Sequence, residues 1–120
     1  MNAEIQMQSS EVICQESDLV ASSGVAALFK GEQIALFYLP DEDSQKIYVV
    51  GNYDPLGRAN VISRGIVGDV KGEPVVASPL YKQHFSLITG RCIENDDVSL
   101  PVYRAELLAG EVIVHGLILP

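Results

Sequence analysis

Short apolar runs separated by turn-forming residues make up most of the chain. No window repeats its apolar positions with the spacing of an amphipathic helix, although residues 20–28 are ambiguous. The pattern predicts strands over the following ranges: Val12–Cys14, Val25–Phe29, Gln33–Tyr38, Lys46–Val50, Val61–Ile66, Pro74–Ala77, His84–Leu87, Val102–Leu107 and Glu111–His115. Many short strands at regular spacing are typical of an all-β fold. We therefore expect an antiparallel β sandwich or barrel.

Glycine and proline mark the connections between these strands. Lys30-Gly31-Glu32 and Ala109-Gly110 predict tight hairpin turns, because glycine adopts positive φ without steric cost. Residues 51–60 predict a loop, and Ser78-Pro79 ends a strand because proline cannot continue a central one. With no linker and no internal repeat, we expect a single domain over residues 11–120, preceded by a loose tail over residues 1–10.

Composition and charge narrow the class of protein. The chain has 120 residues, of which 48% are hydrophobic and 20% charged, so one packed domain is expected. Its net charge of −8 disfavours nucleic acid as a partner. The sequence shows no signal peptide and no membrane-spanning run, and its two cysteines do not form a disulfide framework. These features predict a cytoplasmic protein with reduced thiols and no membrane contact.

Two segments resemble the loops that carry the iron-sulfur cluster in a Rieske domain. That family holds a [2Fe–2S] cluster with two Cys and two His, one pair on each loop. Residues 78–92 resemble the second loop and its following hairpin, with Pro79, Phe85, Thr89 and Gly90 in register. Ser78 then occupies the cysteine position and Tyr81 the histidine position. In the first loop, Asn52 stands in place of Cys and Asp54 in place of His.

The replacements themselves resemble a narrower family. Asn-x-Asp-Pro at 52–55, Ser-Arg-Gly at 63–65 and Ala-Ser-Pro-Leu at 77–80 are similar to the small subunit of NADH-dependent assimilatory nitrite reductase. The resemblance spans roughly residues 12–116. It implies an accessory subunit of a complex that reduces nitrite to ammonia with NAD(P)H in nitrate assimilation. It also implies a large catalytic subunit carrying FAD, a [4Fe–4S] cluster and sirohaem, and no catalytic residue on this chain.

Ligand chemistry predicts that this chain itself binds no cluster. An amide at Asn52 and a hydroxyl at Ser78 do not replace thiolates, and oxygen atoms at Asp54 and Tyr81 do not replace imidazole nitrogens. A substitute metal site would need every Cys and His of the chain to converge. We expect instead that Cys14 and Cys92 are small buried residues and that His84 and His115 make ordinary hydrogen bonds. The prediction is therefore no cofactor and no metal.

Several interpretations remain open at this level. The altered loops are either a docking surface or compact remnants of a cluster site. The basic residues around them either meet acids of the large subunit or, as is commoner, pair locally with Asp54 and Asp69; these residues are Arg58, Arg64, Lys82 and Arg91. A free-standing protein-binding or regulatory module and an electron-transfer ferredoxin are the rival functions. An exposed sheet edge could also support self-association.

Overall fold

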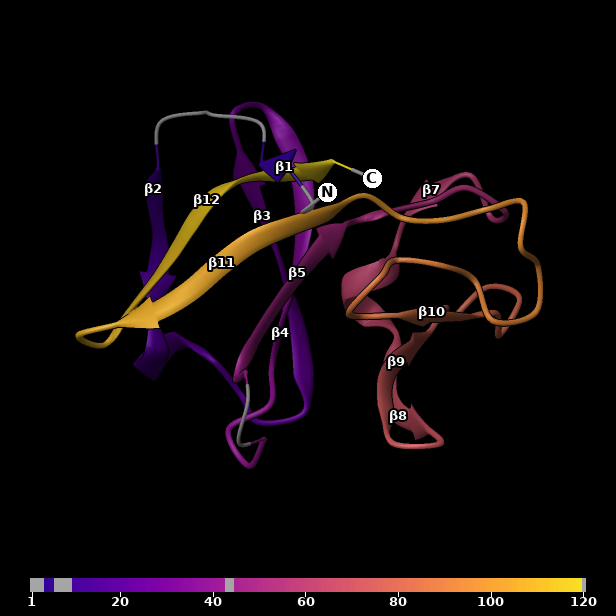
Figure 1. Cartoon of the computed structure of the whole chain (residues 1–120), viewed down its shortest axis with the longest axis horizontal. Helices are drawn as coiled ribbons and strands as arrows, with labels where there is room; N and C mark the ends of the chain where they lie inside the picture. The colour runs from indigo at the N-terminus through magenta and orange to yellow at the C-terminus, as the bar shows by residue number, and fades with distance from the viewer. Residues whose placement is uncertain (1–3, 6–9, 43–44, 120) are drawn as a thin grey trace.

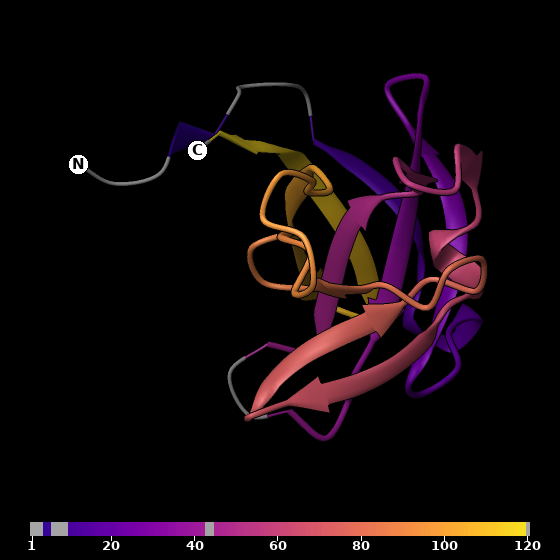
Figure 2. The same ribbon diagram turned by 90° about the vertical axis from the view of Figure 1, so that its right-hand side faces the viewer.

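Strands account for nearly all the regular structure of the chain (Figures 1 and 2). The computed structural model describes residues 4–5, 10–42 and 45–119. Two single turns of 3-10 helix interrupt the strands, η1 (Glu16–Asp18) and η2 (Ile62–Arg64). The strands are β1 (Glu4–Ile5), β2 (Glu11–Gln15), β3 (Ser23–Phe29), β4 (Glu32–Tyr38), β5 (Ile47–Gly51), β6 (Tyr53–Asp54), β7 (Ala59–Asn60), β8 (Ile66–Val70), β9 (Glu73–Ala77), β10 (His84–Ser86), β11 (Val102–Leu108) and β12 (Glu111–Leu119).

These strands form one large sheet, one small sheet and a short ribbon. The large sheet has the order β1-β12-β11-β5-β4-β3, and β2 also pairs with β12. The small sheet has the order β10-β9-β8, and β6 pairs with β7. Every pairing is antiparallel. The predicted all-β, antiparallel class is confirmed. Figure 1 shows the small sheet and its loops on one side of the large sheet.

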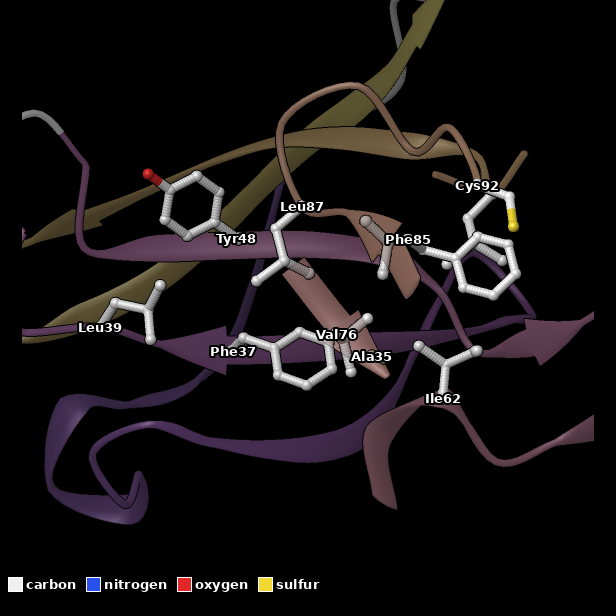
Figure 3. Packing of buried hydrophobic residues seen from close by; sticks show 11 residues of the cluster. Ala35, Phe37, Leu39, Tyr48, Ile62, Val76, Phe85, Leu87 and Cys92 are labelled. Carbon is white, nitrogen blue, oxygen red and sulfur yellow. The ribbon is translucent and has the colours of Figure 1, made fainter. Parts of the chain in front are cut away.

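Strands β4 and β5 are buried on both faces, which explains why their sequences are continuous apolar runs rather than alternating ones. One face packs against η2 and the small sheet, through Ala35 and Phe37 on the large sheet and Val76 and Phe85 on the small one (Figure 3). The other face lines the inside of the curved large sheet, where Ile34 and its neighbours meet residues of β11 and β12. These two strands therefore hold both halves of the molecule together.

Most of the predicted strands are present with slightly shifted ends, but the strand predicted over Val61–Ile66 is wrong. Residues Ile62–Arg64 instead form η2, and a strand begins only at Ile66. The backbone amides here bond locally, from Arg64 N to Val61 O at 2.9 Å and from Gly65 N to Ile62 O at 2.9 Å. Local bonds of this kind end the extended ladder, and they let the apolar Ile62 side chain point into the core.

The loose tail expected over residues 1–10 falls largely outside the described residues. Within it, β1 pairs with β12, through Glu4 with Leu119 and Ile5 with Ile118. The tail and the boundary of the domain at residue 11 stay predictions.

Gly90 provides a test of the turn that follows β10. Its φ is +79°, and a Cβ at this position would lie 2.1 Å from the Leu100 carbonyl oxygen. Gly72 has a similar φ of +87° with open space around it. An alanine at this position therefore measures the cost of the left-handed backbone without a steric clash. We expect Gly72→Ala to cost roughly 1–2 kcal/mol of unfolding free energy. Gly90→Ala should cost at least about 2 kcal/mol more, because the backbone must also shift. Urea denaturation of both variants measures the difference, and equal losses would contradict the close approach.

Candidate functional site

The four positions that replace cluster ligands lie on two loops beside the small sheet. The first loop runs from Asn52, directly after β5, through β6 and β7. The second loop connects β9 with β10 and starts at Ser78. Asn52, Asp54 and Ser78 are 1%, 0% and 0% exposed, whereas Tyr81 is 65% exposed. The structure thus buries three of the four predicted positions and leaves Tyr81 at the surface.

Asp54 and Ser78 connect the two loops. The Ser78 hydroxyl donates a short hydrogen bond to Asp54 Oδ2. The other carboxylate oxygen, Oδ1, accepts from the backbone amides of Leu56 at 2.9 Å and Gly57 at 3.0 Å. Aspartate favours such bonds to amides two and three residues ahead, which shape the first loop into a turn. Hydrogen bonds to a carboxylate are stronger than neutral ones, so this pair links the loops firmly.

Asn52 attaches the first loop to the rest of the fold. Its side-chain amide donates to Gln33 Oε1 at 3.2 Å and to the Asn60 carbonyl at 3.3 Å. Its side-chain carbonyl accepts from the Ser63 amide at 2.8 Å. All polar atoms of this buried side chain are therefore in use, and the bonds reach β4, β7 and the turn η2.

Both loops close in the same way. Arg58 N donates to Asp54 O at 2.7 Å, and Lys82 N donates to Ser78 O at 3.1 Å. Each of these bonds closes a turn that starts at a member of the hydrogen-bonded Asp54–Ser78 pair and ends at a cation. Arg58 and Lys82 also adopt left-handed backbone conformations, with φ of 58° and 62°. Such conformations are uncommon for residues other than glycine and persist where the surrounding structure fixes them.

The loops also pack against each other directly. A Cβ built on Gly57 would lie 2.3 Å from Leu80 Cδ1 and 3.0 Å from Asp54 Oδ2. The absence of a side chain at Gly57 therefore lets Leu80 of the second loop lie over the first. Arg58 follows Gly57 directly, so the cation comes from the segment of the first loop that Leu80 contacts.

The local pairing expected with Asp54 and Asp69 is wrong for all four basic residues. Across the described residues, neither Arg58, Arg64 nor Lys82 makes an ion pair, and Arg91 meets Asp96 at 3.7 Å. The reason lies in the carboxylates. Asp54 is buried and already occupied by donors from the two loops, and Asp69 accepts from the Gly72 amide at 3.0 Å in its own hairpin.

This set of donors does not fit a [2Fe–2S] cluster. Such a cluster takes two thiolates and two imidazoles, and the three buried positions instead offer oxygen and amide groups already bonded to protein. Tyr81 points its phenol to the outside. Elsewhere in the described ranges, no group of three or more His, Cys, Asp or Glu side chains is arranged to hold a metal ion. No chemical step can be assigned to a cluster at this site.

The histidines and cysteines serve structural contacts. His84 Nδ1 lies 2.6 Å from Glu94 Oε2, and His115 lies 2.7 Å from both Glu106 Oε1 and Ser10 Oγ. The predicted ordinary hydrogen bonds of the histidines are confirmed. The Ser10–His115–Glu106 arrangement was not apparent from the sequence, because 105 positions separate its first two members. Ser10 is exposed, and the bond connects the start of β2 with β12.

Cys92 is buried as predicted, whereas Cys14 is only half-buried. Desolvation is the main cause that raises the pKa of both thiols, so both stay protonated at neutral pH.

Among the helical turns in the described part of the chain, none has the length and apolar character needed to cross a bilayer.

Comparison with known proteins identifies the family. Residues 10–115 match the family described as the Rieske-like [2Fe-2S] domain. The nitrite reductase (NADH) small subunit of Salmonella typhimurium is 39% identical over 104 residues, which cover 87% of this chain and 94% of that protein. The chain belongs to the family of nitrite reductase (NADH) small subunits. The resemblance inferred from the altered loops is therefore confirmed.

Two further matches extend the relationship. A crystal structure described as an NADH-dependent nitrite reductase small subunit from Mycobacterium tuberculosis is 40% identical, with a TM-score of 0.83 over 91% of this chain and 96% of that one. A nitrite reductase NAD(P)H large subunit from Klebsiella oxytoca is 36% identical over 102 residues, which cover 85% of this chain and 10% of that protein. A segment similar to this small subunit thus occurs inside a protein named as a large subunit.

The buried pair makes a direct prediction about stability. Asp54→Ala removes the acceptor of two backbone amides and the Ser78 hydroxyl, so we expect a loss of about 3 kcal/mol of unfolding free energy. Ser78→Ala should cost less, about 1 kcal/mol, because Asp54 keeps its amide donors. The double variant should lose less than the sum of the two single variants, since the residues are coupled.

Asp69→Ala is the matched control for this prediction. Asp69 accepts one backbone amide at an exposed hairpin, so its loss should cost under about 1 kcal/mol. Urea denaturation followed by circular dichroism gives all four values. Equal effects of Asp54→Ala and Asp69→Ala would contradict the role of the buried pair.

Proposed function

We propose that this chain is the non-catalytic small subunit of an NAD(P)H-dependent nitrite reductase complex that reduces nitrite to ammonia in nitrate assimilation. The observation that carries the proposal is the Klebsiella oxytoca relative, in which a segment 36% identical to this chain belongs to the large subunit itself. Covalent connection keeps two modules at a high effective concentration. A separate chain of the same family must reach the same association through a binding surface, and the partner proposed here is the large catalytic subunit.

The donor chemistry of the two altered loops supports a division of roles between the subunits. Reduction of nitrite to ammonia transfers several electrons and needs redox groups, and Asn52, Asp54 and Ser78 supply none. We assign FAD, the [4Fe–4S] cluster and sirohaem to the large subunit, as the family resemblance implies. The small subunit then contributes a rigid surface. The proposal includes a cytoplasmic location and a single cluster-free domain over residues 11–120, with residues 1–10 as a tail.

Co-purification tests the association. The large subunit and this chain, expressed together with a tag on the large subunit only, should elute as one complex. NADH-dependent nitrite reduction by the isolated large subunit should rise when the purified chain is added, because the proposed role is to complete the complex. Bovine serum albumin at equal concentration controls for nonspecific stabilisation. Unchanged activity together with separate elution would refute the proposal.

The cluster-free state has its own test. After anaerobic incubation with ferrous iron, sulfide and dithiothreitol, followed by desalting, the chain should be colourless and free of iron. A Rieske ferredoxin with all four ligands, treated in parallel, should regain its visible absorbance and shows that the procedure works. Stoichiometric iron and sulfide on this chain would overturn the assignment of the four altered positions.

A further inference from the structure

An exposed surface covers the buried pair of the two loops. We define the tip surface as Gly57 and Arg58 of the first loop with Leu80, Tyr81 and Lys82 of the second. Leu80 and Tyr81 are 45% and 65% exposed, and the two cations are exposed as well. Leu80 lies over Gly57, as the 2.3 Å approach of a built Cβ shows, so the contributions of the two loops are continuous.

The tip surface combines features that are enriched in protein interfaces. Tyrosine and arginine are over-represented among the residues that dominate binding energy, especially where an aromatic ring stands beside apolar neighbours. Here the Tyr81 ring follows Leu80 directly and is flanked by Lys82. A single large apolar side chain on a surface costs a protein little stability. An exposed aromatic ring next to cationic side chains, however, is well suited to bind in a pocket of a partner protein.

The tip surface carries positive charge, whereas the chain as a whole is negatively charged. The protein has 16 acidic and 8 basic residues, yet neither Arg58 nor Lys82 makes an ion pair within the described part of the chain. The Asp54 carboxylate of the first loop is 0% exposed and is engaged by donors of the two loops. Both cations are therefore available to carboxylates of another protein. The chain's net charge of −8 disfavours a partner face that is acidic throughout.

The tip surface is also preorganised. The Ser78–Asp54 hydrogen bond joins the two loops, and the bonds from Arg58 N to Asp54 O and from Lys82 N to Ser78 O each close a turn within one loop. Binding through loops already fixed in shape costs less conformational entropy than binding through loops that must order. The left-handed backbone at both cations, with φ of 58° and 62°, is maintained by the same framework.

Leu108 and Lys71 are exposed residues outside the tip surface, and neither combines an apolar group with unpaired cations. Leu108 is 56% exposed at the β11–β12 turn, but the nearby charged residues on its hairpin are Glu106 and Glu111. Lys71 is an exposed cation without an ion pair in the described residues, but it lies between Asp69 and Glu73 in the β8–β9 hairpin. These two positions therefore supply matched controls for the apolar and cationic parts of the tip surface.

We propose that the tip surface docks onto the large subunit, at a patch where acidic side chains surround an apolar pocket that receives Tyr81. The inference rests on the proposed function, since it names the face used for that association. Arg58 and Lys82 would pair with the acidic rim, while Leu80 and Tyr81 lose their contact with water. The altered loops are then an interface that the buried pair keeps in shape.

Binding of purified chain to immobilised large subunit tests this docking face. Arg58→Glu with Lys82→Glu should weaken binding about tenfold or more, and Tyr81→Ala should do the same, because each removes a central contact. Lys71→Glu and Leu108→Ala should bind within about twofold of the wild-type chain, since both lie on other hairpins. Lys71 has a φ of 52°, close to that of Lys82, so the pair is matched in backbone conformation.

Further readouts separate the possible outcomes. Thermal denaturation should leave the tip variants as stable as the controls, because the changed side chains are exposed. High salt should weaken binding of the wild-type chain more than that of the Arg58→Glu and Lys82→Glu double variant.

If the wild-type chain binds and the tip variants bind equally well, the docking face is wrong while the proposed function stands. If the wild-type chain does not bind, the proposed function fails and the docking face with it.

A second copy of this chain is the competing occupant of the tip surface. Sedimentation of the chain alone should give a monomer, and the tip variants should leave its mass unchanged. A wild-type dimer that the tip variants dissociate, while Lys71→Glu does not, would overturn the proposal in favour of self-association.

Discussion

A buried carboxylate needs donors for its oxygens, and in this chain Asp54 takes them from two loops at once. Its Oδ2 accepts from Ser78 across the site, while its Oδ1 holds the amides of Leu56 and Gly57 in a turn. Without the carboxylate, the second loop loses its hydrogen bond to the first, and the first loop loses the bonds that shape its turn. The close packing of Leu80 over Gly57 and the positions of both loop-end cations depend on this arrangement.

The sheets explain why the loops can be held so firmly. Both loops leave buried strands, the first from β5 and the second from β9. The small sheet packs on a face of β4 and β5 whose opposite side already lies against the core of the large sheet. Asn52 adds hydrogen bonds from the first loop to Gln33 on β4 and to the amide of Ser63. A surface that rests on several layers of packed strand moves little when it meets a partner.

The sequence predicted the fold well because most strands of this chain are apolar runs bounded by turns that contain glycine or proline. The error at Val61–Ile66 arose where an apolar residue, Ile62, enters the core from a helical turn, which looks the same as a strand in a one-dimensional pattern. The altered ligand positions were located through the resemblance to the two Rieske loops, with Pro79, Phe85 and Gly90 in register. Their geometry could not be predicted, because Asp54 and Ser78 are 24 positions apart and nothing in a single sequence indicates that they bond.

The same limit explains the wrong prediction for the basic residues. Local pairing with Asp54 was reasonable from proximity in sequence, but it required that carboxylate to face solvent. Its complete burial, and its use by amide and hydroxyl donors, depend on contacts that only the folded chain makes. Unpaired cations at a loop tip are thus a property of the tertiary structure, even though the residues themselves were identified from the pattern around the two loops.

The shared carboxylate also bears on how such a chain can change over evolutionary time. Replacing Ser78 by cysteine or Asp54 by histidine, one at a time, would leave a buried group without its partner before any metal could compensate. Four ligands would have to arise nearly together before the free energy of binding a cluster could compensate for that loss of stability. A scaffold stabilised in this way therefore resists the stepwise acquisition of an iron-sulfur cluster. The hydrogen-bonded pair therefore opposes a return of cluster ligands. The exposed residues above the pair can meanwhile change and become specialised without disturbing it.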